Sequence, residues 1–227
     1  MLDFQLMDKD LSNIQGKINT AKLLRDKNIQ DQATHKSETT HDRLPPGQRL
    51  LSDPNSFPVL DLGTRPEFNP DTYRFQVSGL VEKPLDLNWN EVLALPKTTL
   101  TADFHCVTKW TQYDIAWAGI KYLDLEKLAG VKSEAKFLIQ YGLDGYTTNV
   151  PLADLRKDSV LFAYELKGQP LPQEHGWPLR LIIPELYAWK GSKFLNKIEF
   201  RAEDAPGFWE VRGYNNHGDP WKEERYS

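Results

Sequence analysis

Hydrophobic and polar residues alternate along several short stretches of the chain, and this alternation predicts β-strands. In the clearest example Tyr73, Phe75 and Val77 alternate with polar residues until Gly79 ends the run. Runs rich in β-branched and aromatic residues predict further strands at 99–104, 136–141, 160–165, 179–183 and 194–201. Turn-forming pairs separate some of these runs, namely Asp144-Gly145 and Lys167-Gly168.

Helical signals are fewer and shorter. Asn88 stands three residues before Glu91, which is the signature of a capped helix N-terminus, and the helix ends before Pro96. A second helix is expected over 122–129, closed by Gly130. Strands and helices do not alternate regularly, so a parallel βαβ sheet is not indicated. The sequence predicts an α+β fold, with a strand-rich mixed sheet core and short helices.

Residues 1–43 differ from the remainder of the chain. The stretch 25–43 is polar, has no apolar face and favours a flexible linker. The sequence leaves two interpretations open for this arm, a disordered tail or a helix that docks on the body or on a partner. We therefore divide the chain into an N-terminal arm, 1–43, and one domain, 44–227. Apolar residues at helical spacing predict a short amphipathic helix within the arm: Met7, Leu11, Ile14, Ile18 and Ala21.

Composition narrows the class of protein. Hydrophobic residues make up 40% of the 227 residues and aromatic residues 11%, which is enough for a sizeable core. The net charge of −4 does not indicate a basic surface that would bind nucleic acid or anionic lipid. No apolar run is long enough to span a membrane. The first residues are acidic where a secretory signal is basic, and there is one cysteine, so a cytoplasmic location is expected.

The single cysteine, Cys106, lies in the sequence FHCVTKW at 104–110. One cysteine forms no intramolecular disulfide and builds no cysteine-rich zinc or iron–sulfur site. Taken alone, it is either a buried apolar filler or a single reactive or metal-bound thiolate. Because it follows the strand predicted at 99–104, it is expected at the end of a sheet.

Two later segments also contain candidate functional groups. The first, 171–200, combines basic and hydroxyl side chains with a glycine-containing loop, which suits a phosphate but equally suits the solvated ends of a strand. The second, 207–226, is rich in glycine and aromatic residues and contains His217, so it is either a flap that closes over a site or an ordered tail. The candidate phosphate-binding residues of the first segment are His175, Arg180, Lys190, Ser192 and Lys193.

Considered together, these segments resemble a known family. FHCVTKW is followed by a HGxPLRLxxP segment at 175–184 and by YAWKGSKFL at 187–195, and FPVLDLG precedes them at 57–63. This order resembles the molybdopterin-binding domain of sulfite oxidase-like oxidoreductases, most closely their compact bacterial and archaeal branch. The resemblance extends from Leu44 to the C-terminus.

The resemblance implies a mononuclear molybdenum–molybdopterin cofactor, in the monophosphate form without a nucleotide. In this family one cysteine thiolate binds molybdenum and the pterin dithiolene supplies two more sulfurs, so a single cysteine is sufficient; Cys106 matches that position. Tyr214 matches a tyrosine near the metal. By the same match, the remaining cofactor-binding residues are Leu60, Asp61, Tyr141, His175, Arg180, Gly191, Ser192 and Lys193.

Departures from the family pattern bear on the substrate. Sulfite oxidases place arginines a few residues after the cysteine, whereas this chain has Trp110 and Thr111 there, with only Lys109 nearby. Sulfite is therefore less favoured than an S- or N-oxide, and an aromatic substrate pocket is expected, walled by Trp110, Trp117, Trp209 and Tyr214. The expected reaction is a two-electron redox step or oxygen-atom transfer by a monomeric enzyme, with electrons exchanged through an external protein partner.

Two other functions are considered. A molybdopterin carrier without turnover would share the phosphate-binding residues but would not need Cys106 beside an open metal position. A cysteine hydrolase would use Cys106 as nucleophile and His105 or His175 as base. Adjacent side chains on a strand point to opposite faces, which opposes a Cys106–His105 pair.

Overall fold

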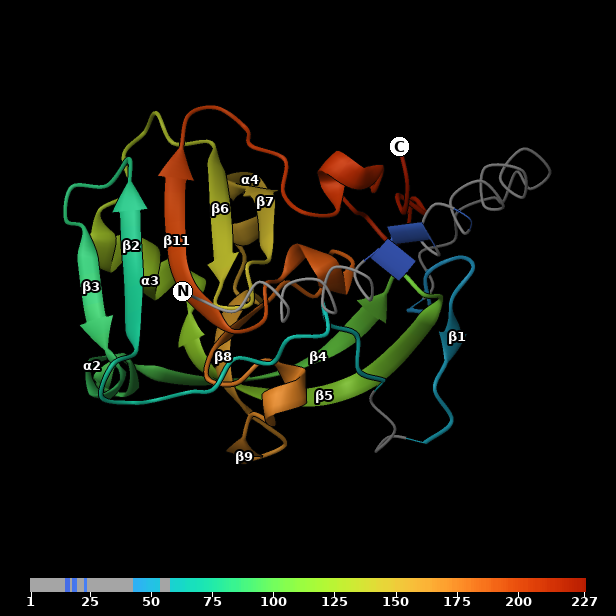
Figure 1. The fold of residues 1–227 in the computed structure, drawn as a ribbon, viewed down its shortest axis with the longest axis horizontal. Helices are drawn as coiled ribbons and strands as arrows, with labels where there is room; N and C mark the ends of the chain where they lie inside the picture. The colour runs from blue at the N-terminus through green and yellow to red at the C-terminus, as the bar shows by residue number, and fades with distance from the viewer. Residues whose placement is uncertain (1–14, 17, 20–22, 24–42, 54–57) are drawn as a thin grey trace, which may run out of the picture.

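The computed structural model describes residues 15–16, 18–19, 23, 43–53 and 58–227 (Figure 1). Most of the predicted N-terminal helix lies outside these residues. Of its five apolar positions only Ile18 is described, and it is helical and buried. The division of the chain at residues 43 and 44 stays a prediction.

The described strands form two sheets, which confirms the strand-rich mixed architecture. In the six-stranded sheet, called sheet A, the order is β1-β5-β8-β10, with β4 paired to β5 and β9 paired to β8. Its strands are β1 (Arg49–Leu50), β4 (Lys97–Cys106), β5 (Trp110–Lys121), β8 (Leu161–Leu166), β9 (Gln169–Pro170) and β10 (Arg180–Ile182).

The five-stranded sheet, called sheet B, has the order β3-β2-β11-β6-β7. Strand β11 runs parallel to β2 and antiparallel to β6, so the last long strand of the domain is inserted between two strands that come earlier in the chain. In Figure 1 sheet B stands upright and the β4–β5 hairpin crosses below it. The strands are β2 (Arg74–Gly79), β3 (Leu85–Asn88), β6 (Phe137–Gly142), β7 (Thr147–Pro151) and β11 (Leu195–Arg201).

The helices are short, as the sequence predicts. In α2 (Trp89–Ala94), Asn88 and Glu91 form the expected reciprocal capping box. The helix α3 (Tyr122–Ala129) ends at Gly130, whose φ of 62° is the left-handed conformation that glycine adopts at low cost. The remaining helical segments are α4 (Leu152–Leu155) and the 3₁₀ turns η1 (Gln173–His175), η2 (Ala188–Lys190) and η3 (Glu210–Arg212).

Strand β8 separates two hydrophobic cores. Phe162 and Tyr164 face the first core, which lies against sheet B, α2 and α3, whereas Leu161 and Ala163 face the second. This follows from the alternation of side chains along a strand. Strand β10 continues the pattern, because Leu181 lies in the first core and Ile182 in the second. The second core contains Cys106 and most of the aromatic residues discussed below.

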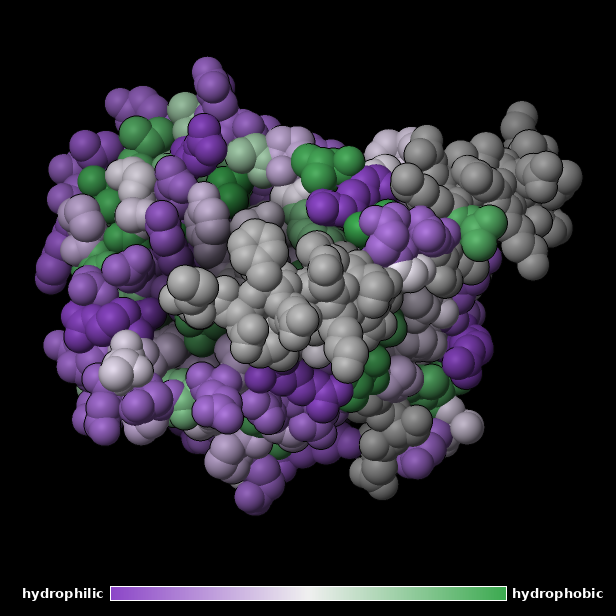
Figure 2. All heavy atoms as spheres, in the orientation of Figure 1, coloured by the Kyte–Doolittle hydropathy of each residue, from purple (hydrophilic) through white to green (hydrophobic). Residues whose placement is uncertain are grey.

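The surface view shows a mainly hydrophilic face with hydrophobic residues in small separate groups (Figure 2). Among the described residues, no helix has the length and hydrophobicity needed to cross a bilayer.

Candidate functional site

Cys106 is the last residue of β4, at the turn into β5. It pairs with Trp110 across the hairpin, and the backbone N–H of Lys109 donates to the Cys106 carbonyl at 3.2 Å. The residue is 5% exposed, and its sulfur lies 3.1 Å from the hydroxyl oxygen of Thr108. The cysteine therefore lies at the end of the strand, as predicted, and faces the second core.

Two opposing effects act on the Cys106 thiol. Burial raises its pKa, because the thiolate loses hydration. The Thr108 hydroxyl, the guanidinium of Arg225 and the ammonium of Lys193 act in the opposite direction, since each stabilises the thiolate. The net pKa is raised, so the surroundings supply positive charge to a thiol that is otherwise protonated.

Arg180 lies in the second core, on the same side of β10 as Ile182. It is 2% exposed, and its guanidinium carbon lies 5.1 Å from the Phe104 ring centroid and 5.5 Å from that of Trp117. One terminal nitrogen donates to the His175 carbonyl at 2.8 Å, while Nε has no hydrogen-bond partner within the described part of the chain. Burial lowers the pKa of Arg180 to about 10, and the Cys106 charge opposes this shift. A buried guanidinium with an unused N–H is thus available to an acceptor.

The loop after η2 is fixed by its backbone. A Cβ added at Gly191 would lie 2.1 Å from the Leu181 carbonyl oxygen, so only glycine allows this loop to lie directly on β10. The Ser192 backbone N–H donates to the Gln140 side chain at 2.8 Å, and the Ser192 carbonyl accepts from Leu181. These contacts place the predicted anion-binding loop beside Arg180.

Lys193 joins this loop to the early FPVLDLG segment. Its ammonium donates to the carbonyls of Leu60 and Glu174, each at 2.7 Å. Burial lowers the pKa of Lys193 to about 7, with a further contribution from the charge of Arg180. Asp61, next to Leu60, accepts from Arg65 at 3.0 Å. The structure thus brings Leu60 and Asp61 to the same loop as Lys193.

His175 lies close to these cations. The residue is 8% exposed, and burial lowers its pKa to about 4, with Arg180 and Lys193 adding to the shift. Its imidazole is therefore neutral at physiological pH. A neutral ring can exchange hydrogen bonds with a ligand but adds no charge to the site.

Tyr141 is not part of this group. Its hydroxyl donates to Glu199 at 2.8 Å and Lys197 lies over its ring at 4.9 Å, both across sheet B. Gln140 is the residue of β6 that faces the loop, with bonds to the Ser192 N–H and the Lys190 carbonyl at 2.8 Å each. Tyr141 and Gln140 therefore lie on opposite faces of β6, because one position on a strand reverses the face, and a contact of Tyr141 with the cofactor stays a prediction.

Lys190 is also unavailable to a phosphate. Its ammonium is fully buried and lies 2.6 Å from a Glu210 carboxylate oxygen, with further bonds to Asn149 and to the Asn216 carbonyl. Thr148 donates to the same Glu210 oxygen. This ion pair holds η2, η3 and β7 together and is a structural element of the site.

Tyr214 follows η3 within a group of aromatic side chains. Its ring centroid lies 4.9 Å from that of Trp209, 5.2 Å from Trp189 and 5.1 Å from Tyr226. Burial raises the pKa of Tyr214, and the charges of Tyr226 and Cys106 raise it further. The hydroxyl is therefore a proton-bearing donor near Cys106. Segment 207–226 is an ordered part of the site rather than a separate tail.

The other predicted aromatic walls divide into two groups. Trp110 lies opposite Cys106, whereas Trp117 is fully buried beneath Arg180 as part of the core. His105 does not pair with the cysteine: its ring lies 2.9 Å from the Thr111 hydroxyl and packs against Trp221. Burial lowers the pKa of His105 to about 4. This arrangement does not support a hydrolase in which His105 activates Cys106.

Sequence reasoning missed three residues beside the thiol. Thr108 is two residues from Cys106 and could have been noticed. Gln48 and Arg225 come from opposite ends of the domain: Gln48 donates to the Cys106 carbonyl at 3.0 Å, and Arg225 donates to the Val107 carbonyl at 3.3 Å. No local pattern links such distant positions.

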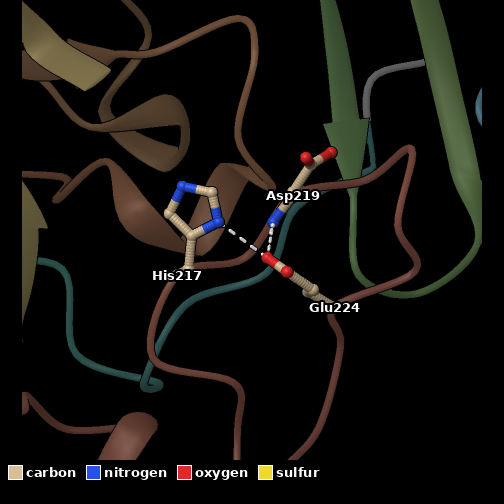
Figure 3. A group of neighbouring side chains, drawn as sticks. All are labelled: His217, Asp219 and Glu224. Carbon is tan, nitrogen blue, oxygen red and sulfur yellow. Dashed lines mark hydrogen bonds and ion pairs between the residues drawn. The ribbon is translucent and has the colours of Figure 1, made fainter. Parts of the chain in front are cut away.

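His217, Asp219 and Glu224 form a second polar cluster (Figure 3). His217 Nδ1 lies 2.7 Å from a Glu224 oxygen, and Nε2 lies 3.1 Å from an Asp154 oxygen. Asp219 accepts from the Trp221 backbone N–H and pairs with Lys222. Both ring nitrogens already have carboxylate partners. The cluster therefore joins α4 to the C-terminal segment through ion pairs of His217.

The ion pairs of His217 predict a pH-dependent contribution to the free energy of unfolding. The bond to Asp154 raises the pKa of His217 above its ordinary value of 6.5, so its contribution is full below pH 6.5 and is lost as pH rises through the folded-state value. His217 lowers the pKa of Asp154 below its ordinary 3.8, so that contribution disappears only in stronger acid. The difference in free energy of unfolding between wild type and His217→Gln should be largest at about pH 5–6 and shrink towards pH 9.

Urea unfolding of wild type and His217→Gln at a series of pH values checks this expectation. Both proteins keep the neighbouring charges Lys157, Asp219 and Lys222. Lys222→Gln, at the exposed end of the cluster, is the control and should show a much flatter difference. A difference for His217→Gln that stays constant with pH would contradict the ion-paired reading.

Comparison with known proteins places this site in a family. Residues 62–209 match the family described as "Oxidoreductase molybdopterin binding domain". The chain is 43% identical to "Uncharacterized oxidoreductase YuiH" of Bacillus subtilis (strain 168), with 82% of this chain and 92% of that protein covered. The chain belongs to the molybdopterin-binding oxidoreductase family.

More distant relatives agree with this assignment. Rattus norvegicus "Sulfite oxidase, mitochondrial" is 29% identical, with 66% of this chain but only 33% of that protein covered. The crystal structure of the sulfane dehydrogenase SoxCD from Paracoccus pantotrophus matches with a TM-score of 0.54 and 28% identity, over 61% of this chain and 40% of that chain. The protein is thus a sulfite oxidase-like molybdopterin oxidoreductase, and its family implies a molybdenum–molybdopterin cofactor.

The residues present fit this cofactor. Cys106 offers a soft sulfur donor in a cationic setting, which suits a metal already bound to sulfur. Arg180 offers a buried Nε–H that lacks a partner among the described residues, and Lys193 lies in the adjacent loop. Together the two cations suit a terminal phosphate.

Proposed function

We propose that this oxidoreductase transfers an oxygen atom to or from a small substrate, with an S- or N-oxide as the favoured class. The observation that carries the proposal is the convergence of the buried Cys106 thiol, the buried Arg180 guanidinium, the half-buried Lys193 and an aromatic group that includes Tyr214 at one end of sheet A. The thiol suits the metal, the cations suit the phosphate, and the aromatic group suits a small, uncharged part of a substrate.

In this proposal Cys106 is the protein ligand to molybdenum, and Thr108 stabilises its thiolate. Arg180, Lys193 and the backbone of Gly191 and Ser192 hold the pterin phosphate. Leu60 and Asp61 contribute from the early segment, and His175 contributes from η1. The compact loop favours the monophosphate form of the cofactor, without a nucleotide.

The bound cofactor supplies a two-electron redox couple and the oxygen-atom exchange. Reduction of an S-oxide breaks the S–O bond and consumes two electrons and two protons, yielding a sulfide and water. The Tyr214 hydroxyl keeps its proton at physiological pH and can hydrogen-bond the substrate oxygen. The surrounding tryptophans exclude water from this exchange.

In this proposal the electrons come from a separate redox protein. The chain has a single cysteine, and a c-type haem or an iron–sulfur cluster needs several cysteines, so the chain holds no such relay of its own. A monomeric state and a cytoplasmic location stay predictions.

The names of two relatives are consistent with an S-oxide as the substrate class. Campylobacter jejuni "Protein-methionine-sulfoxide reductase catalytic subunit MsrP" is 27% identical, with 56% of its length covered. "Putative protein-methionine-sulfoxide reductase subunit YedZ1" of Azospira oryzae is also 27% identical, with 58% covered. Trp110 and Thr111 carry no charge, so neither position after the cysteine provides a cation for sulfite.

The test is to produce the protein in a host that makes the cofactor and to measure molybdenum and pterin per chain. Turnover is then followed with dimethyl sulfoxide and trimethylamine N-oxide, using reduced benzyl viologen as electron donor, and with sulfite, using ferricyanide as acceptor. Near-stoichiometric metal with reduction of an oxide is the expected result. Stoichiometric metal without any turnover would favour a cofactor carrier, and oxidation of sulfite alone would reverse the favoured substrate.

A further inference from the structure

Strand β4 lies at an edge of sheet A. Among the described residues it pairs with β5 alone, so the other side of its backbone has no strand beside it there. The run TTLTA at 98–102 contains no charged residue, proline or glycine, and the bulge of the hairpin begins only after Ala102. Natural edge strands commonly carry such features to prevent pairing, and threonine favours strands. This part of β4 is therefore suited to pair with a further strand.

The two faces of this edge differ in character. Lys97, Thr99 and Thr101 are exposed on one face. Leu100 and Ala102 lie on the other face and pack against the second core. A strand added at this edge would extend a polar row on one face and an apolar row on the other.

An apolar groove adjoins the start of β4. It is lined by Leu95 and Pro96, which directly precede the strand, and by Leu128 of α3, which is 39% exposed. Its volume of about 450 Å³ is in the range of small-molecule pockets, so an aromatic side chain fits into it. Exposed apolar side chains that gather beside an open sheet edge are typical of a protein interface.

The two ends of the uncharged run carry complementary groups. At the start, the Lys97 ammonium lies next to the groove, which is also lined by Asp124. At the far end, Asp103 accepts from Arg43 at 2.7 Å, and the Arg43 guanidinium lies 4.1 Å from the centre of the Tyr113 ring. One end thus offers a cation beside a groove with a carboxylate, and the other offers a carboxylate beside an aromatic ring and a guanidinium.

We propose that a second copy of this chain docks on this edge, with the two β4 strands antiparallel and paired about Leu100. In this register Lys97 lies opposite Asp103 of the partner subunit, and Thr99 lies opposite Thr101 of the partner subunit. Opposite charges and threonine pairs directly across an antiparallel ladder are both stabilising. The groove beside Lys97 then receives Tyr113 of the partner subunit.

Each copy keeps its own site in this arrangement. Cys106 lies six residues beyond Leu100, so the two Cys106 residues are about 40 Å apart along the paired strands. The interface therefore does not depend on the proposed function. It differs from the monomeric state predicted from the sequence, and sedimentation decides between the two.

Sedimentation velocity of the full-length protein over a range of concentrations tests the interface. Wild type should shift from monomer to dimer as the concentration rises. Thr99→Lys/Thr101→Lys places like charges opposite one another twice in the dimer and should remain monomeric. Thr99→Lys/Thr101→Glu is the matched control, because it places opposite charges there, and it should associate about 10-fold or more tightly than the first variant. Both positions are exposed, so the monomer should keep its fold, which urea unfolding checks.

Leu128→Glu tests the groove independently of the strand. A carboxylate in the groove would be buried among apolar side chains by the partner subunit, so dimerisation should weaken about 10-fold or more. Val211→Glu is the matched control, since Val211 lies on η3 and is 65% exposed. It should dimerise like wild type.

A wild type that stays monomeric at every concentration would overturn the proposal. Equal association of the two double variants would also overturn it, because the register predicts opposite effects. If a double variant does not fold, the groove variants decide: equal association of Leu128→Glu and Val211→Glu would reject the interface.

Discussion

Cys106→Ser should reduce turnover of an S- or N-oxide by on the order of 10²–10³-fold or more, with little change in the stability of the fold. Serine has nearly the volume of cysteine, and the adjacent Thr108 hydroxyl, 3.1 Å from the sulfur, can hydrogen-bond either side chain. The hydroxyl, however, is a hard oxygen donor that does not ionise at neutral pH, so it replaces a soft thiolate poorly. The loss is therefore expected in the chemistry rather than in folding.

Steady-state turnover with reduced benzyl viologen measures the effect, together with molybdenum content and the absorption spectrum of each protein. Thr108→Val is the matched control, because it removes the hydroxyl beside the sulfur but leaves the thiol in place. It should lose far less activity than Cys106→Ser. Full activity in Cys106→Ser would remove the thiol from the mechanism and return Cys106 to a packing role.

Iodoacetamide labelling separates a metal-bound thiolate from a free nucleophile. Cys106 is buried, and a bound metal would protect it further, so the loaded protein should label slowly. Metal-free protein, unfolded in denaturant, gives the fully labelled reference. Rapid labelling of the loaded, folded protein would instead support a nucleophilic cysteine.

Local sequence signals predicted most of the fold well. The Asn88–Glu91 capping box and Gly130 mark helix ends through contacts within a few residues, and both helices form where expected. The alternation around Phe75 fixes β2 because one face of that strand is buried and the other exposed. Such elements depend on near neighbours, which a sequence displays directly.

Strand β5 was missed although it pairs with three strands of sheet A. It is buried along both faces for much of its length, so its hydrophobic pattern shows no clean alternation. It pairs with β1, β4 and β8, and each partner comes from a different part of the chain. A strand specified by such pairings has a weak local signature.

In the candidate site, too, residues with a recognisable local sequence context were predicted, and residues brought in by distant contacts were not. Cys106 and the Gly191–Lys193 loop were identified because their sequence context resembles a family, and the structure places them near one another. Tyr141 and Gln140 are neighbours in the sequence but point to opposite faces of β6, and the sequence pattern alone does not show which of the two faces the loop. Arg225 was missed because it contacts Val107 only in the folded chain, across a sequence separation of 118 residues.

Lys190→Met should lower the free energy of unfolding by about 3–5 kcal/mol, the other large effect expected in this protein. The side chains of Lys190 and Glu210 are 0% and 1% exposed, and the ammonium lies 2.6 Å from the carboxylate. Removing the ammonium leaves a buried carboxylate without its cation, and the second oxygen of Glu210 already lacks a hydrogen-bond partner in the described residues. Methionine fills a similar volume, so the loss is electrostatic rather than a cavity effect.

Urea unfolding of Lys190→Met, Glu210→Gln and the double variant measures this pair. The double variant should be more stable than Lys190→Met alone, because no charge is then left buried and unpaired. Lys97→Met is the matched control: Lys97 and Glu165 are also 2.6 Å apart, but their side chains are 49% and 24% exposed, so the change should stay within about 1 kcal/mol. Equal losses in Lys190→Met and Lys97→Met would show that burial does not set the strength of the pair. The pair joins η2, which contains Trp189, to η3, which precedes Tyr214. A large loss of unfolding free energy in Lys190→Met therefore also predicts that the aromatic side of the site opens locally before the molecule unfolds.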